Sequence, residues 1–504
     1  MSEENSYRQI LRSTSIIGGA SVVNILVGLL RTKVVAVLLG PAGLGLIALL
    51  QSLMNTATAI AALGFANVGT RQIAESMGRG DPTAVAAARR ALFWGTLLLA
   101  IVGAAGFWLL RGVLASDVLK TPSLSGDVGW LALGVALTVA AGSQGALLNG
   151  LRRIGDIARV SIASALLSTV LGVGALLLWG KHGMLVFVLA TPLASFLFSH
   201  IYVARLGRLR APRTPLPKLA AQWTTLARLG LAFMLSGVVV TAGQLIVRAM
   251  INSNLGPAAL GHFQASWAIS MTYIGFVLGA MGTDYYPRLT AAIHDHATVN
   301  RLVNEQTEVA LLLAGPVFLA MLGLAPWVID LLYSSRFEVA AQILRWQILG
   351  DILKVASWPL GFILLAAGDG RAFLWSESVA MAAFAGLVWL GLLVLGIQAA
   401  GVAFLGMYVL YLPLVHWLAR RRTGFSWDRR VIMQLLVLVA SALVVFAIAA
   451  WSVWGGAALG VAASMLLGIQ GLARLGHMAN LGGPLERIAV RSRSLMMKLG
   501  VWRE

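Results

Sequence analysis

Three ionisable residues and a glutamine lie inside one apolar stretch of this 504-residue chain, in the segment from Arg345 to Lys354. On a helix with 3.6 residues per turn, Gln347, Asp351 and Lys354 share one face. Each charged side chain costs about 2.5 to 3.5 kcal/mol at the centre of a membrane helix. A carboxylate can take up a proton or a cation, and an amine can bind an anion. The segment therefore predicts a working site that faces protein or water.

Composition places the surrounding chain in a bilayer. Hydrophobic residues make up 59% of the sequence and charged residues only 11%, which is far from the composition of soluble proteins. Lys and Arg outnumber Asp and Glu by 38 to 19, but they fall in short runs between apolar stretches, as topology signals do. We therefore expect no nucleic-acid partner. The absence of cysteine excludes disulfides, thiol nucleophiles and Cys-ligated metal sites.

Fourteen apolar stretches are long enough to cross a membrane, for example 9–39 and 43–71. They predict an all-α polytopic membrane protein with two six-helix lobes around a central cavity and a C-terminal helix pair. The predicted parts are an N-terminal lobe at 1–206, a cytoplasmic linker at 207–222, a C-terminal lobe at 223–422, an additional helix hairpin at 423–475 and an amphipathic basic tail at 476–504.

An internal repeat supports the two lobes. The sequence from Leu39 to Gly45, Leu-Gly-Pro-Ala-Gly-Leu-Gly, recurs from Leu255 to Gly261 as Leu-Gly-Pro-Ala-Ala-Leu-Gly, 216 residues later. Six spans lie between the two copies, so both lobes keep the same orientation in the membrane, which is typical of transporters that work by alternating access. The alternative is that Gly-Pro-Ala is simply a favourable turn.

The basic loops predict orientation and one partner. With a cytoplasmic N-terminus, most Arg and Lys residues outside the spans fall on the cytoplasmic side, so both termini are expected there. The first span lacks the features of a removable signal peptide and is expected to be retained. The tail places apolar residues on one side and basic residues elsewhere, so we expect it to lie on anionic inner-leaflet lipids.

The first span of each predicted lobe carries a polar stripe. Asn24 and Arg31 share one face of the first, with Lys33 nearby, and Gln244 and Arg248 share one face of the seventh. Basic residues at membrane depth line solute pathways or pair with partners, so these five residues are candidate substrate-binding residues. For Arg31 and Lys33, the alternative is that they extend to the membrane interface. Span 223–255 contains no carboxylate, which makes Arg248 the clearer candidate.

The segment around Asp351 has two interpretations that sequence leaves open. Asp351 and Lys354 are a structural ion pair, or Asp351 is a coupling residue that binds a proton or sodium ion and so releases Lys354 for an anionic substrate. Gln347 and Arg345 complete the candidate substrate-binding set, although Arg345 lies near the outer interface and can also snorkel there. No His, Asp or Glu spacing predicts a metal site, and no cofactor is expected.

Several motifs together resemble the bacterial lipid-linked oligosaccharide flippases of the Wzx type, in the multidrug/oligosaccharidyl-lipid/polysaccharide exporter superfamily. They are Leu39 to Leu46, Ser335-Arg336-Phe337, and Trp346-Gln347 followed by Gly350-Asp351 and Lys354. The resemblance implies an inner-membrane protein that moves an undecaprenyl-diphosphate-linked glycan, of the O-antigen or enterobacterial common antigen type, from the cytoplasmic to the periplasmic leaflet. Polysaccharide-assembly membrane proteins are further implied partners.

Two other functions are alternatives to a flippase. A multidrug exporter of the same superfamily would need deep carboxylates for cationic drugs, and Asp351 is the clear one. A membrane glycosyltransferase or polymerase would need a sizeable outer loop for its catalytic side chains, and the longest outer segment, near 115–127, is short. We therefore expect a transporter rather than an enzyme.

Overall fold

The computed structural model describes residues 3–206 and 216–478. The predicted tail therefore lies outside the described residues from position 479 onward, as does most of the predicted linker. The remainder of that linker, from Leu216 onward, forms the start of a long helix.

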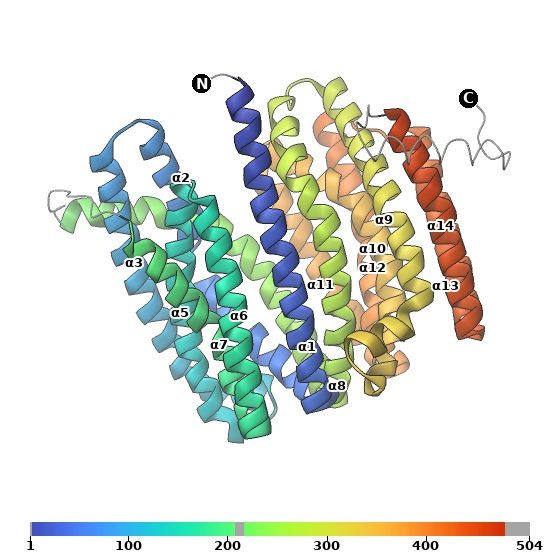
Figure 1. Cartoon of the computed structure of the whole chain (residues 1–504), viewed down its shortest axis with the longest axis horizontal. Helices are drawn as coiled ribbons and strands as arrows, with labels where there is room; N and C mark the ends of the chain where they lie inside the picture. The colour runs from blue at the N-terminus through green and yellow to red at the C-terminus, as the bar shows by residue number, and fades with distance from the viewer. Residues whose placement is uncertain (1–2, 207–215, 479–504) are drawn as a thin grey trace. The chain divides into compact units, whose positions relative to one another are not determined.

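The described chain is built from helices (Figure 1). The long ones are α1 (Glu3–Ala61), α3 (Pro82–Leu109), α5 (Ser125–Gly150), α6 (Ile154–Trp179), α7 (Met184–Ala204), α8 (Leu216–Ala291), α9 (His296–Leu332), α10 (Glu338–Ala366), α11 (Gly370–Leu395), α12 (Gln398–Thr423), α13 (Arg429–Trp451) and α14 (Val453–Met478). Shorter elements are α2 (Phe65–Gly78), α4 (Arg111–Val113) and single turns at Leu114–Val118, Pro122–Leu124, Gly180–Gly183 and Ser335–Phe337.

Eleven helical stretches among the described residues are long and apolar enough to cross a membrane. Three of them, 18–61, 154–204 and 233–275, span 44, 51 and 43 residues, about twice the length that one crossing needs. Each of the three contains a kink or a turn, at Gly40, at Gly180–Gly183 and at Gly256. The eleven stretches thus hold the fourteen predicted crossings, and the prediction of an all-α polytopic membrane protein is confirmed.

The chain divides into two compact units, Met1–Gly261 and His262–Glu504. Within the first unit, α6 packs on α7 and α1, and α5 packs on α3 and α7. Within the second, α10 packs on α12 and α9, and α11 packs on α12. The division falls inside α8, so its first half, which was predicted to open the second lobe, lies in the first unit. The lobe boundaries derived from the repeat stay a prediction.

Both copies of the repeated Gly-Pro-Ala sequence break a helix in the same way. Gly40 has φ 64° and ψ −168°, and Gly256 has φ 82° and ψ 173°. This backbone region is open essentially to glycine alone, because a Cβ would clash there. The proline that follows suits the start of the next helical segment, where its missing N–H is no loss. The repeat therefore encodes the same kink twice.

The third helix of each repeat also begins alike. Asp81 caps α3 and Asp295 caps α9, each accepting bonds from backbone N–H groups two and three residues on. Threonine hydroxyls add to this, from Thr83 at 2.7 Å and from Thr298 at 2.6 Å. These bonds lower the pKa of both carboxyl groups, so the caps stay charged at neutral pH. The kinks and caps thus recur at matching places in the chain.

The two kinked segments touch backbone to backbone within the first unit. A Cβ on Gly45 would overlap the carbonyl oxygen of Pro257, and a Cβ on Gly261 would overlap that of Pro41. The contact is reciprocal, because Gly45 and Gly261 occupy the same position in the two copies of the repeat. Glycine at both positions is what allows α1 and α8 to approach this closely.

The predicted second span, 43–71, was wrong at its end. Helix α1 stops at Ala61, since Leu63 and Gly64 take left-handed conformations with φ of 44° and 67°. A separate short helix, α2, then follows. The intervening sequence is apolar, so composition alone does not show the break.

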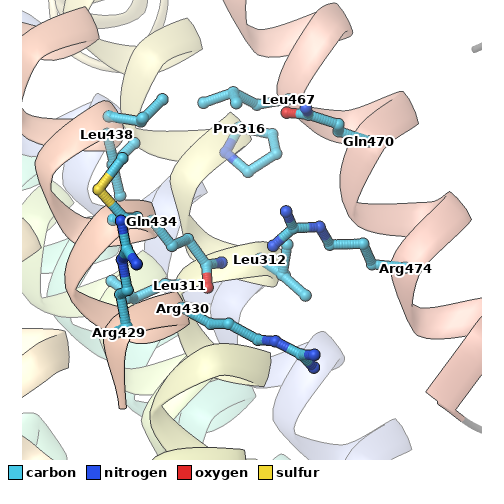
Figure 2. Close-up of a pocket in the computed structure, with 12 residues that line it drawn as sticks. Leu311, Leu312, Pro316, Arg429, Arg430, Gln434, Leu438, Leu467, Gln470 and Arg474 are labelled. Atoms are coloured by element: carbon cyan, nitrogen blue, oxygen red, sulfur yellow. The ribbon is translucent and has the colours of Figure 1, made fainter. Parts of the chain in front are cut away.

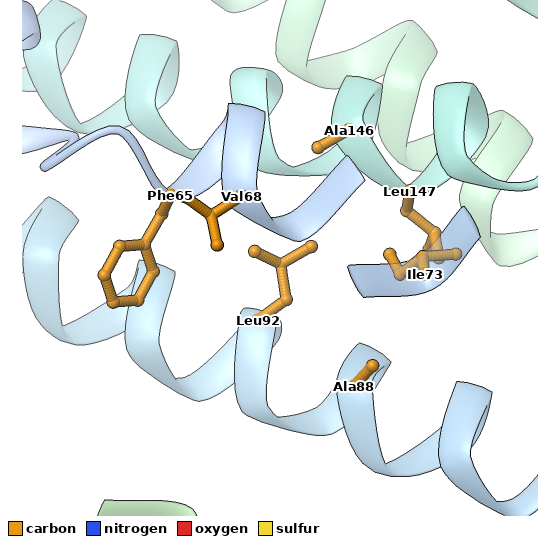
Figure 3. Close-up of a cluster of buried hydrophobic side chains, with 7 residues drawn as sticks. All are labelled: Phe65, Val68, Ile73, Ala88, Leu92, Ala146 and Leu147. Carbon is orange, nitrogen blue, oxygen red and sulfur yellow. The ribbon is translucent and has the colours of Figure 1, made fainter. Parts of the chain in front are cut away.

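Helix α2 is fixed by a small apolar cluster (Figure 3). Its members come from three helices: Phe65, Val68 and Ile73 of α2, Ala88 and Leu92 of α3, and Ala146 and Leu147 of α5. The opposite side of α2 is exposed and carries the Arg71–Glu75 ion pair at 2.7 Å. The helix is therefore amphipathic and lies against α3 and α5 instead of continuing the preceding span.

The extra helices α13 and α14 form a hairpin that packs on α9. Gln434 of α13 donates to the backbone oxygen of Glu308 at 3.3 Å, and Arg474 of α14 lies 3.7 Å from the Glu308 carboxylate. The loop before α13 is tied to α9 as well, because the Asp428 N–H donates to Asn304 at 2.8 Å. The hairpin is thus an integral part of the second unit.

The Gly45 contact predicts a steric effect on stability. Gly45→Ala should lower stability by about 1–3 kcal/mol, because the methyl group meets fixed backbone atoms. Gly142→Ala is the matched control, since a Cβ there meets nothing within 4 Å and alanine favours the helix. Thermal unfolding of purified protein in detergent measures the difference. Equal melting temperatures for the two variants would contradict the close approach.

Candidate functional site

Asp351 is the centre of a polar site in the second unit. Its side chain is fully buried, and one carboxylate oxygen accepts hydrogen bonds from Ser270 at 2.7 Å and from Tyr273 at 2.5 Å. Both donors come from α8 and lie one turn apart. Two hydroxyl donors on one oxygen offset part of the desolvation cost of a buried carboxylate.

The other carboxylate oxygen of Asp351 has no hydrogen-bond partner among the described residues, and neither polar atom of Gln347 has one. Gln347 is also fully buried, one turn away on the same face of α10. Buried polar groups are normally satisfied, so an acceptor carboxylate oxygen beside a free amide is an arrangement suited to a small polar ligand. The prediction that these two side chains share a face is confirmed.

Lys354 lies in an aromatic setting one turn further on. Its Nζ is 3.4 Å from the Met271 sulfur and 6.0 Å from the ring centroids of Phe404 and Tyr408, the outer limit of a cation–π contact. Lys354 also lines a pocket of about 190 Å³ between α10, α11 and α12. The ammonium group is thus only weakly neutralised by its direct contacts.

Glu377 and Tyr411 line the same pocket, joined by a hydrogen bond of 2.9 Å. Glu377 lies in the first third of α11 and was not among the residues predicted from the sequence to form the site. The structure brings it to the pocket of Lys354, so one ammonium group stands between two carboxylates of the second unit.

No ion pair within 4.0 Å joins Asp351 to Lys354 in the part of the chain that the structure describes. Asp351 faces Ser270 and Tyr273, while Lys354 faces Met271. A direct structural ion pair, one of the two interpretations drawn from the sequence, therefore does not hold in this conformation. The role of Asp351 in coupling stays a prediction.

Arg345 has a different position from the one expected. It is 8% exposed and donates to the backbone oxygen of Ala449 at 3.0 Å, near the end of α13. Its neighbour Trp346 packs on Phe446 of the same helix, with ring centroids 4.5 Å apart. Arg345 thus caps a helix end, where a positive charge is favourable. Arg345 is therefore anchored to α13, and its substrate-binding role stays a prediction.

Arg31 is held inside the first unit by neutral acceptors. Its guanidinium donates to the Phe187 oxygen at 2.8 Å, to Thr191 at 2.7 Å and to Ser168 at 3.4 Å, and it lies 4.0 Å from the Phe187 ring centroid. These groups belong to α6 and α7, so the guanidinium is held against two neighbouring helices of the first unit. No carboxylate pairs with it among the described residues, and its positive charge is retained.

Asn24 lies on the same stripe and, like Arg31, contacts α6. It donates to Ser161 of α6 at 2.6 Å, and its own oxygen has no partner among the described residues. Lys33 is partly exposed nearby in sequence. Asn24 and Arg31 therefore remain together along α1, as predicted, with polar atoms left for a ligand.

Arg248 is buried at 7% exposure, and Gln244 accepts from it at 3.2 Å through the side chain. The two residues are one turn apart on α8, so their predicted common face is confirmed. One turn further, Asn252 donates to the Leu119 oxygen at 3.1 Å. The substrate-binding role of Arg248 stays a prediction.

Sequence reasoning missed the residues that surround Asp351 and Lys354. Ser270, Tyr273, Tyr408 and Tyr411 are separated from them by 54 to 81 residues, and each looks ordinary in an apolar helix. One signal was available: tyrosines in mid-span positions need a polar partner when buried. The chain has only 8 tyrosines, so their positions in α8 and α12 were informative.

Fold and site together define a multi-pass helical membrane protein with charged groups held at membrane depth. The chain belongs to the family described as polysaccharide biosynthesis protein, whose model matches residues 34–342. It is 25% identical over 418 residues to the lipid III flippase of Escherichia coli K12, covering 80% of this chain and 97% of that protein. The Shigella flexneri lipid III flippase matches to the same extent.

Solved structures show the same fold at low sequence identity. The lipid II flippase MurJ in an inward closed conformation has a TM-score of 0.67 at 12% identity, over 92% of this chain and 99% of its own. An inward-facing multidrug resistance MATE family transporter of the MOP superfamily has a TM-score of 0.65 at 16% identity, over 80% of this chain and 94% of its own. Both likenesses show the fold alone, and the Wzx type stays a prediction.

The bonds to Asp351 predict a stability effect that depends on charge. Tyr273→Phe should cost about 1.5–3 kcal/mol, the range for a hydrogen bond to a charged group. The control is Tyr285→Phe, which removes a 3.0 Å bond to the neutral Pro359 carbonyl and should cost about 0.5–1.5 kcal/mol. Chemical unfolding in detergent compares them. A Tyr273 variant no less stable than the control would mean that Asp351 does not carry a charge there.

Proposed function

We propose that this protein is a flippase of the bacterial inner membrane that moves a polyprenyl-diphosphate-linked oligosaccharide from the cytoplasmic to the periplasmic leaflet. The proposed mechanism is alternating access coupled to a proton or sodium ion. The proposed cargo is an undecaprenyl-diphosphate unit of the O-antigen or enterobacterial common antigen type. On this proposal the chain is a secondary transporter and not an enzyme.

The observation that carries the proposal is the environment of Arg31. A guanidinium inside a membrane-spanning helix is costly, and here its bonds go to two hydroxyls and a carbonyl. These acceptors orient the group without neutralising it. A fixed, uncompensated positive charge favours an anionic ligand, and a planar guanidinium suits the oxygens of a diphosphate. Family membership and the lipid III flippase relatives support the same cargo class.

The site around Asp351 supplies the proposed coupling. The free oxygen of Asp351 and the amide of Gln347 are suited to a proton or a small cation. Binding there would alter the electrostatic field at Lys354, one turn away, and so its affinity for an anion. Ion and cargo would then bias the same conformational equilibrium, which is the requirement for coupling.

Export of organic cations is the second candidate, because Glu377 lines an aromatic pocket with Trp358, Tyr408 and Tyr411. Aromatic rings with a carboxylate are what a cationic ligand would need. Lys354 lines that same pocket, however, and its charge disfavours a cation. The flippase proposal is therefore the stronger one.

The first test measures cargo movement. In proteoliposomes with a fluorescent polyprenyl-diphosphate sugar, Arg31→Gln should slow leaflet exchange by about 10²-fold or more, because one charge-assisted contact of roughly 3 kcal/mol is lost. Arg345→Gln is the control, since that arginine contacts α13. Equal rates for Arg31→Gln and wild type would refute the assigned role, provided both proteins are present in equal amounts.

The second test addresses coupling. Asp351→Asn is nearly isosteric and still accepts from Ser270 and Tyr273, so the protein should fold. It should nevertheless lose the acceleration that an imposed proton or sodium gradient gives to wild-type transport. Gradient-driven transport at the wild-type rate in this variant would remove Asp351 from the coupling mechanism and leave it a structural residue.

A further inference from the structure

A pocket of about 550 Å³ lies between α9, α13 and α14, away from both groups of residues described above. The size is within the range of ligand-binding pockets. One end is basic, with Arg429 and Arg430 at the start of α13 and Arg474 near the end of α14. The other end is mainly apolar, with Pro316, Leu438 and Leu467 beside the amide of Gln470 (Figure 2). The pocket is thus amphipathic along its length.

The polar groups of this pocket face one another. In Figure 2, Arg474 extends from α14 and Gln434 from α13 toward the same space, and the guanidinium of Arg430 lies below it. Arg429 and Arg430 are both exposed, and neither forms an ion pair with a described residue. The residues that line the pocket include three arginines and no carboxylate. The carboxylate of Glu308, beside the pocket, lies 3.7 Å from the guanidinium of Arg474 and balances one of the three positive charges. The basic end therefore keeps a net positive charge.

Gln434 adds a second, independent requirement. Its amide nitrogen donates to the Glu308 backbone oxygen at 3.3 Å, but its amide oxygen is buried and has no donor among the described residues. A ligand that bears a hydroxyl group would satisfy this acceptor. A bare phosphate monoester dianion or a hydrocarbon tail alone would not.

We infer that this pocket binds an anionic glycerophospholipid with a hydroxyl-bearing headgroup, of the phosphatidylglycerol class. The phosphodiester lies between Arg430 and Arg474, a headgroup hydroxyl donates to Gln434, and an acyl chain follows the apolar end along α9. The arginines belong to the side of the membrane that the basic loops assign to the cytoplasm, where pockets of this kind between helices bind anionic lipids. The site fastens α13 and α14 to α9 and does not depend on the proposed cargo.

The experiment titrates lipids into the purified full-length protein in detergent and counts bound lipid by native mass spectrometry. The probes are phosphatidylglycerol, phosphatidic acid, phosphatidylethanolamine and undecaprenyl diphosphate. Arg430→Gln with Arg474→Gln should weaken phosphatidylglycerol binding by about tenfold or more. The matched control is Arg420→Gln with Arg421→Gln, which removes the same charge from the end of α12 and should leave binding unchanged.

A single substitution tests whether the pocket recognises the headgroup hydroxyl. It also keeps the inference testable if the double arginine variant does not fold. Gln434→Leu should remove the preference for phosphatidylglycerol over phosphatidic acid while leaving the general attraction to anionic lipids. Equal phosphatidylglycerol binding in the double variant and its control would overturn the inference. The inference would also be overturned if the double variant lost undecaprenyl diphosphate binding but kept phosphatidylglycerol binding. That result would assign the pocket to the cargo. Wild-type binding of phosphatidylethanolamine equal to that of phosphatidylglycerol would also overturn it.

Discussion

The structure depends on the cost of keeping charge inside a membrane. Each deep ionisable side chain in this protein has its own solution. Asp351 receives two hydroxyl donors, Arg31 has neutral acceptors and an aromatic ring, and Arg345 caps a helix end. These arrangements leave different amounts of charge behind. Arg345 bonds to the end of α13, whereas Arg31 and Asp351 bond to neutral side chains and backbone within their own units.

The fold gives these groups their positions through repetition. The same glycine kink occurs at Gly40 and Gly256, and the same aspartate cap occurs at Asp81 and Asp295. The sites around Arg31 and Asp351, by contrast, do not correspond to each other in the repeat, although the polar stripe of α1 has a counterpart in Gln244 and Arg248 of α8. Arg31 is fixed by α6 and α7 of the first unit, and Asp351 by α8 in the second. Arg31 and Asp351 thus have chemically distinct surroundings, which the proposed function assigns to an anion and to a proton or small cation.

Several features of the fold and the site could be predicted from the sequence, because periodicity and composition determine structure within a single helix. The crossings were predicted from the length of the apolar stretches, the repeat from the recurring Gly-Pro-Ala sequence, and the common face of Gln347 and Asp351 from helical spacing. The partners of Asp351 were not, since Ser270 and Tyr273 reach it through the register of α8 against α10, which no local pattern encodes. The same limit applies to Arg345, whose contact with α13 lies 104 residues away. The break before α2 was missed for another reason, because its residues are apolar on both sides.

On the proposed function, fixed positive charge at membrane depth selects an anionic lipid-linked cargo. The direct measurement is leaflet exchange by the wild-type protein in proteoliposomes, comparing one fluorescent oligosaccharide on polyprenyl diphosphate with the same oligosaccharide on neutral polyprenol. The account predicts rapid exchange of the diphosphate lipid, and exchange of the neutral lipid no faster than in protein-free vesicles. Equal acceleration of both lipids, or transport of organic cations in place of either, would contradict it.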